Sequence, residues 1–161
     1  MRIFDKTLAY WWERRGGLIL GLLIIIPILS INPQLSNWIP FIKEIPVIAI
    51  FAFGFLLTLL SIILQGNSEY IQWIKSRKIL FQRFVNYNKR IVIISLILII
   101  YSYFLIFFDF TWFKELFNLS SSLLYYFQTV LLSGFIILIT WFLFDIIRFI
   151  RLFYILIKNN N

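Results

Sequence analysis

Basic and aromatic side chains alternate between residues 65 and 90, in the stretch QGNSEYIQWIKSRKILFQRFVNYNKR. Cationic side chains can follow the phosphates of a single-stranded nucleic acid while aromatic rings stack on its bases. The pattern therefore predicts a site for a nucleotide or a short single strand. The predicted binding residues are Lys75, Arg77, Lys78, Arg83, Lys89 and Arg90, with Tyr70, Trp73 and Tyr87 for stacking and Arg148 and Arg151 as further phosphate contacts.

Two simpler interpretations of the same stretch stay open. Basic residues between two spans can serve only to orient a membrane protein, or they can lie on anionic headgroups at the membrane surface. Apolar residues recur at intervals of three and four, which predicts one amphipathic helix over 66–90. We expect Gly66 to end the preceding helix in the left-handed conformation.

Catalytic chemistry finds little support in the sequence. The chain has no histidine and no cysteine, which excludes imidazole catalysis, thiol chemistry and zinc sites of the usual ligands. Phosphate-loop, dinucleotide and nucleophile-elbow motifs are absent from the sequence. Asp109 and Asp145 are expected at the ends of spans, which disfavours a proton-coupled carrier. We expect no enzymatic activity, no cofactor and no metal.

Composition indicates that lipid is the main solvent of the chain. Of its 161 residues, 61% are hydrophobic and only 14% are charged, whereas about 25% charged residues is usual in soluble domains. A spanning helix needs roughly 17–25 apolar residues. We therefore predict an all-α membrane protein in one transmembrane domain, residues 1–161. Its elements are an interfacial helix over 1–15, spans over about 16–31, 45–64, 91–108 and 123–144, the amphipathic helix over 66–90, and an extension of the last helix over 145–161.

The distribution of charge predicts the orientation. Every lysine and arginine except Lys43 and Lys114 lies in the N-terminal segment, in the 65–90 stretch or at the C-terminal end. The positive-inside rule then places both termini and the 65–90 stretch in the cytoplasm. We expect a multi-pass protein of a bacterial inner membrane.

Small and polar residues form stripes along the predicted spans. Span two carries Gly54, Thr58, Ser61 and Gln65, and span three carries Ser95, Ser102 and Asp109. Such stripes commonly serve close helix packing, with hydroxyls bonded to their own helix. The alternative is that one stripe lines a pore in a homo-oligomer, for which a tetramer is one candidate. The predicted pore-lining residues are Thr129, Ser133, Thr140 and Arg151 in span four.

The size, the four spans, the basic cytoplasmic face and the lack of catalytic residues resemble the channel component of the Hailong anti-phage defence system. The resemblance covers the plan of the whole chain and no diagnostic motif. It implies a homo-oligomeric ion channel that depolarises the infected cell. It also implies gating from the cytoplasm by a nucleotide or a short single-stranded nucleic acid, which a cytosolic nucleotidyltransferase would supply.

Two other classes of function remain compatible with the sequence. The chain could be a non-conducting sensor, immunity or scaffold subunit that docks a cytosolic partner on its basic face. It could also be a holin-like pore that needs no ligand. Conductance and its response to an anionic ligand distinguish the three classes.

Overall fold

A computed structural model describes residues 2–31, 33–67, 69–76 and 78–158. Within these ranges, the side chains of 2–11, 13, 14, 70, 74, 79, 80 and 155–158 are not described, so Arg77 and the Tyr70 ring lie outside the description. The described residues form helices and no strand, which confirms the all-α class. The helices are α1 (Arg2–Ser30), α2 (Leu35–Gln65), α3 (Glu69–Ser76), α4 (Lys78–Phe107), α5 (Phe110–Leu116) and α6 (Ser121–Lys158).

Three of these helices are long and apolar enough to cross a membrane. The qualifying segments are Leu35–Gln65, Phe81–Phe107 and Ser121–Tyr154. The apolar part of α1, Arg15–Ser30, is shorter. The number of membrane spans is therefore three by length and composition, and the place of α1 depends on its packing.

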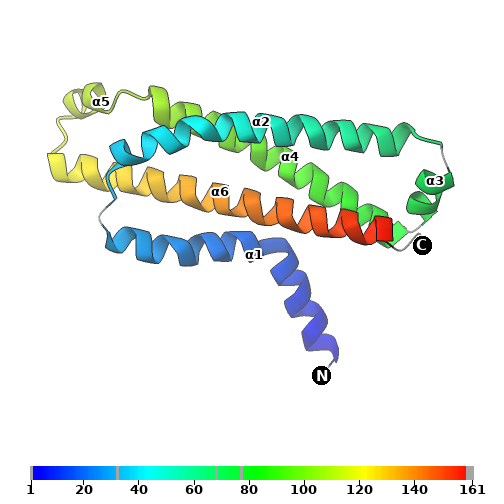
Figure 1. Cartoon of the computed structure of the whole chain (residues 1–161). Coiled ribbons are helices and arrows are strands. Elements are labelled where there is room, and N and C mark those ends of the chain that lie inside the picture. Colours follow the sequence, from blue (N-terminus) through cyan, green and yellow to red (C-terminus); the bar gives the residue numbers. More distant parts are fainter. Residues whose placement is uncertain (1, 32, 68, 77, 159–161) are drawn as a thin grey trace.

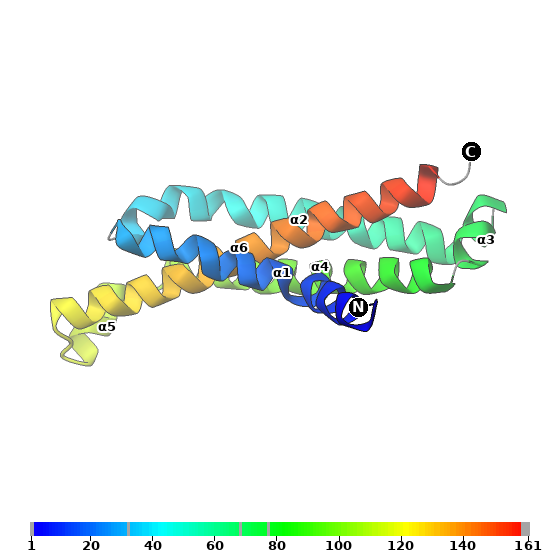
Figure 2. The same ribbon diagram turned by 90° about the horizontal axis from the view of Figure 1, so that it is seen from below.

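The four long helices lie side by side in the spatial order α2, α4, α6, α1 (Figure 1). Each helix runs antiparallel to its neighbours in this row, and the first part of α1 turns away from the bundle. The short helix α3 packs against α4 at one end, where α6 also ends, and α5 lies at the opposite end (Figures 1 and 2). The arrangement leaves α2 and α1 at the two edges of the row.

Helix α2 begins well before the predicted span. Its first turn follows Gln34, so Pro40 and Pro46 lie inside the helix and not in a loop. Figure 1 shows the first turns of α2 inclined to the remainder, as expected where prolines remove backbone donors. The helix continues because Ile42 and Ile45 are buried in the core beside these prolines.

Helix α4 holds the bundle together through one continuous buried seam. Buried residues recur along it at alternating steps of three and four, a spacing typical of helices that wrap around each other with a left-handed twist. Small polar residues occupy alternate layers, and Ser95 and Ser102 donate to the carbonyl oxygens of Ile91 and Leu98 at 2.8 and 2.7 Å. The seam consists of Phe84, Asn88, Ile91, Ser95, Leu98, Ser102 and Leu105.

Helix α1 approaches α6 through glycines. Gly17 and Gly21 are spaced four residues apart, a pattern that allows membrane helices to meet closely. A Cβ atom at Gly21 would lie 3.0 Å from the Cα of Ile137, and one at Gly17 would lie 3.0 Å from the Cα of Trp141. These backbone contacts attach α1 to the bundle as its fourth long helix.

The connection before α5 gives Asp109 a structural role. The expected stripe of Ser95, Ser102 and Asp109 ends at Ser102, because Asp109 lies beyond α4 and caps α5. The Asp109 carboxylate accepts from the hydroxyl and backbone N–H of Thr111 and from the Trp112 N–H. The Thr111 hydroxyl bond and the Trp112 N–H bond lower the pKa of Asp109 below its ordinary value.

The predicted conformation of Gly66 is wrong. Gly66 has φ −67° and ψ 141°, which is extended backbone and not the left-handed region. Glycine is required there by crowding, because a Cβ atom would lie 2.1 Å from the Cδ1 atom of Ile71 and 2.7 Å from the Ile62 carbonyl oxygen. The predicted helix over 66–90 is also divided between α3 and the first turns of α4.

We expect Gly21→Leu to destabilise the fold, because the added side chain meets the α6 backbone. Overpacking of this kind costs about 1–3 kcal/mol, and the thermal midpoint should fall by roughly 2–4 °C for each kcal/mol. Circular dichroism of the protein in detergent measures this change. Ile26→Phe is the control, since it enlarges an exposed side chain of the same helix. Equal losses in both variants would contradict the glycine contact.

Candidate functional site

The cations of the 65–90 stretch and of the C-terminal end lie at one end of the bundle. Helix α3, the first turns of α4 and the last turns of α6 meet there (Figures 1 and 2). Arg148 of α6 reaches Tyr87 of α4, with its Nη1 atom 3.4 Å from the tyrosine hydroxyl. Residues far apart in the sequence therefore share one basic surface.

Four of the predicted ligand residues are exposed at this end. Lys78 and Lys89 lie on the same side of α4, because eleven residues make about three helical turns. Gln82 and Asn86 are exposed on that side between them, so the outer face of the helix is polar. Arg83 and Arg151 are also exposed. We name the four cations Lys78, Arg83, Lys89 and Arg151 the exposed basic set.

Lys75 and Trp73 have roles within the fold. The Lys75 ammonium donates to the carbonyl oxygens of Leu64 and Gly66 at 2.9 and 3.1 Å. A cation at this position satisfies carbonyl groups at the end of α2 that have no partner in their own helix. Trp73 is half-buried and packs against the core. Both residues therefore fasten α3 to the bundle.

Arg90 forms the principal ion pair of the described structure. Its Nε and Nη2 atoms donate to the two carboxylate oxygens of Asp145 at 2.6 and 2.5 Å. The Asp145 side chain is 1% exposed and the Arg90 side chain 25% exposed. Two parallel bonds of this kind are both stronger and more directional than a single contact. The pair links α4 to α6 and takes Arg90 out of the surface available to a ligand.

Tyr87 and Arg148 complete the cluster around this ion pair. The Arg90 guanidinium lies 4.9 Å from the centre of the Tyr87 ring, and the Arg148 guanidinium lies 4.4 Å from that of Phe144. Both rings hold cations by the attraction of a positive charge to the aromatic face. Tyr87 thus contacts two arginines of its own chain and is not presented as an open stacking surface.

One buried polar atom near the cluster, Asn88 Oδ1, has no hydrogen-bond partner among the described residues. Asn88 is fully buried, and its Nδ2 atom donates to the Leu56 carbonyl oxygen of α2 at 2.8 Å. Unsatisfied buried polar atoms are costly. The unpaired oxygen therefore lowers the stability that the seam of α4 provides at its basic end.

The predicted pore-lining residues of α6 lie partly inside the chain. Thr129 and Ser133 are half-buried, and their hydroxyls donate to the carbonyl oxygens of Tyr125 and Thr129 at 2.9 and 2.8 Å. Thr140 is half-buried too, whereas Arg151 is exposed. The hydroxyl bonds agree with the packing interpretation of this stripe.

The stripe of α2 is presented differently. Gly54, Thr58, Ser61 and Gln65 are all exposed on the outer edge of the row. The Thr58 hydroxyl donates to the Gly54 carbonyl oxygen at 2.9 Å. A polar line in an apolar helix thus faces away from the rest of the chain.

The sequence predicts Asp145 at the end of a span but does not predict its ion pair with Arg90. The usable signal was a single acid inside a largely apolar stretch, LITWFLFDIIRF, because a buried acid requires a cation. The spacing of 55 residues between the partners cannot be derived from helical periodicity. No protein family, curated protein or solved structure matches the chain.

We expect Asp145→Leu to destabilise the protein strongly, because it leaves the Arg90 guanidinium without its carboxylate. Breaking one side of a buried pair costs about 3–5 kcal/mol. The double variant Arg90→Met/Asp145→Leu should lose less than the single variant, since both charges are then absent. Denaturant unfolding in detergent of the wild type, of Arg90→Met and Asp145→Leu alone and of the double variant measures the four free energies of unfolding. Arg151→Met, which removes an exposed cation of the same end, controls for charge; additive losses at Arg90 and Asp145 would refute the coupling.

Proposed function

We propose that the chain is an integral membrane protein of a bacterial inner membrane that assembles from identical copies into an ion channel controlled at its basic cytoplasmic end. In this proposal α1, α2, α4 and α6 all cross the bilayer, with both termini in the cytoplasm. The observation that carries the proposal is the exposed polar stripe of α2, Gly54, Thr58, Ser61 and Gln65.

The exposed stripe favours assembly for an energetic reason. Hydroxyl and amide groups gain nothing from lipid tails, whereas small residues allow a neighbouring helix to approach closely. Open space surrounds Gly54 in the single chain. Copies arranged around an axis would bring their α2 stripes together at the edge of each row. A ring of hydroxyls there can form a path for ions, as in channels whose walls come from several subunits.

The geometry favours α2 over α6 as the lining helix. The α6 hydroxyls are half-buried against their own chain, while the α2 hydroxyls are exposed. Val47 and Phe51 are exposed on the same side of α2 ahead of Gly54. In a ring they would form an apolar constriction, and constrictions of this kind close channels by excluding water.

The exposed basic set supports an anionic ligand as the control signal. Lys78 and Lys89 face outward together on α4, and Arg83 and Arg151 add positive charge near them. Phosphate groups are the natural partners of such a surface. The ligand class that fits best is a short single-stranded nucleic acid or nucleotide. It is held through its phosphates and not by stacking of its bases, because Trp73 and Tyr87 have contacts within the chain.

From the resemblance to the channel component of the Hailong system, we further propose a role in anti-phage defence. A nucleotidyltransferase would then supply the ligand, and opening of the channel would depolarise the infected cell. A scaffold that docks a cytosolic protein on the exposed basic set is the second candidate. Conductance separates the two.

Thr58 and Thr129 provide a matched test of the conducting path. Each hydroxyl donates to the carbonyl oxygen four residues earlier at 2.9 Å, so replacement by valine removes the same bond. Thr58→Val should lower ion flux from proteoliposomes several-fold, and Thr129→Val should leave it unchanged. The reverse result, together with altered selectivity in Arg151→Glu, would assign the path to α6. No flux from any variant, with or without oligonucleotide, would favour the scaffold.

Replacement of Lys78 and Lys89 with glutamine should weaken binding of a short single-stranded oligonucleotide. The slope of log affinity against log salt should fall by roughly 0.7 for each phosphate that the protein no longer neutralises. Fluorescence anisotropy over a range of salt concentrations measures both quantities. The double variant Lys43→Gln/Lys114→Gln, at the opposite end of the bundle, is the charge-matched control. Unchanged affinity in the Lys78→Gln/Lys89→Gln variant would remove the exposed basic set from the ligand site.

A further inference from the structure

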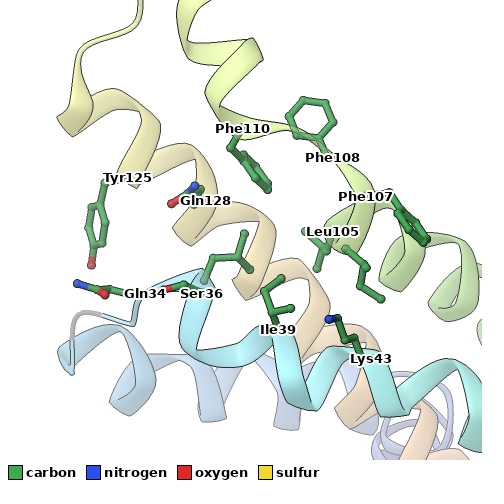
Figure 3. Close-up of a pocket in the computed structure, with 12 residues that line it drawn as sticks. Gln34, Ser36, Ile39, Lys43, Leu105, Phe107, Phe108, Phe110, Tyr125 and Gln128 are labelled. Atoms are coloured by element: carbon green, nitrogen blue, oxygen red, sulfur yellow. The ribbon is translucent and has the colours of Figure 1, made fainter.

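A cavity of about 780 Å³ lies at the end of the bundle opposite the exposed basic set. It is enclosed by the beginning of α2, the end of α4 and the first turns of α5 and α6 (Figure 3). Its volume is in the range of small-molecule sites in proteins. None of the residues that the proposed channel uses belongs to its wall.

The wall of the cavity is divided into an apolar and a polar part. Leu105, Phe108 and Phe110 come from the end of α4 and the beginning of α5. Across from them, Tyr125 points its hydroxyl toward Gln34, and Gln128 reaches in from the same helix as Tyr125 (Figure 3). A ligand that fills the cavity must therefore have one apolar and one polar end.

Lys43 is the charged residue of the wall, and it lies beside the apolar residues rather than beside Gln34 and Tyr125 (Figure 3). It is exposed and projects from α2 toward Leu105 (Figure 3). No carboxylate belongs to the described lining residues. The nearby acid Asp109 is already bonded to Thr111 and Trp112 at the beginning of α5. One cation in a wall whose described residues include no acid favours a ligand whose polar end is anionic.

We propose that the cavity binds an anionic phospholipid. Its phosphate contacts the Lys43 ammonium, its headgroup extends toward the amides of Gln128 and Gln34, and an acyl chain follows Leu105 and Ile106 along the outside of α4. Basic pockets between membrane helices bind lipid headgroups by the same combination of charge and hydrogen bonds.

The position of the cavity distinguishes a lipid from a soluble anion. The spanning segments of α4 and α6 end at Phe107 and begin at Ser121, so the cavity lies where the apolar bundle gives way to its connections. A lipid headgroup occupies this depth in a bilayer. A soluble phosphate compound would use Lys43 and leave the apolar wall uncovered. The proposal does not depend on conduction by the chain.

Native mass spectrometry of the detergent-solubilised protein tests the site. Dioleoyl phosphatidylglycerol should remain bound at one molecule per chain, with affinity at least tenfold above dioleoyl phosphatidylcholine. Lys43→Gln should remove most of this preference, a tenfold loss that corresponds to about 1.4 kcal/mol. Lys114→Gln is the control, because Lys114 lies at the same end but donates to Ser121 and does not line the cavity.

A second variant tests the cavity without changing its charge. Ser36 is exposed and lines the cavity, so Ser36→Phe should fill part of the space and reduce binding of both lipids. Retention of phosphatidylglycerol unchanged in both Lys43→Gln and Ser36→Phe would overturn the proposal. Displacement of the lipid by glycerol 3-phosphate at equal concentration would overturn it as well, because the site would then select a soluble anion.

Discussion

The buried seam of α4 is the constraint on which the rest of the bundle depends. Its layers alternate large apolar residues such as Phe84 and Leu98 with the small polar residues Asn88, Ser95 and Ser102. The small layers let α2 and α6 approach from two sides, and the large layers fill the space between them. Since lipid tails compete equally for apolar surface, this fit supplies most of the force that holds membrane helices together. The packing of α4 thus accounts for three helices of the row, and α1 is added through its glycine contacts with α6.

Charge at the basic end is divided between structure and surface. Arg90 and Lys75 serve the fold, through Asp145 and through the last carbonyl groups of α2. Lys78 and Lys89 are exposed on the outer face of α4. A basic stretch in a membrane protein therefore overstates its ligand surface, because helix ends and buried acids require part of its positive charge.

Periodicity in the sequence predicted the helical class and located the apolar segments, because lipid requires long helices with satisfied backbone groups. Two predictions were wrong for the same reason: that Pro40 lies in the connection between the spans 16–31 and 45–64, and that Gly66 has the left-handed conformation. In both places contacts between helices determine the backbone conformation. Burial of Ile42 in the core keeps the chain helical near Pro40, and the side chain of Ile71 crowds Gly66. The Arg90–Asp145 pair was missed because residue types indicate that a buried acid needs a cation but not which one. Exposure of the α2 stripe could not be predicted either, because it depends on which helices lie next to α2 in space.

The order of Arg90 and Asp145 along the chain has a consequence for biogenesis. The arginine is synthesised 55 residues before the aspartate, so α4 enters the membrane while its future partner is still on the ribosome. Arg90 directly precedes the apolar run that begins at Ile91, and a long arginine side chain at such a boundary can keep its charge in the headgroup region during this interval. The short aspartate has no such reach and arrives when the cation is already in place. The arginine, whose side chain can stay at the membrane surface, is thus synthesised first. Helix α6 can then insert with Asp145 next to a cation that is already in place.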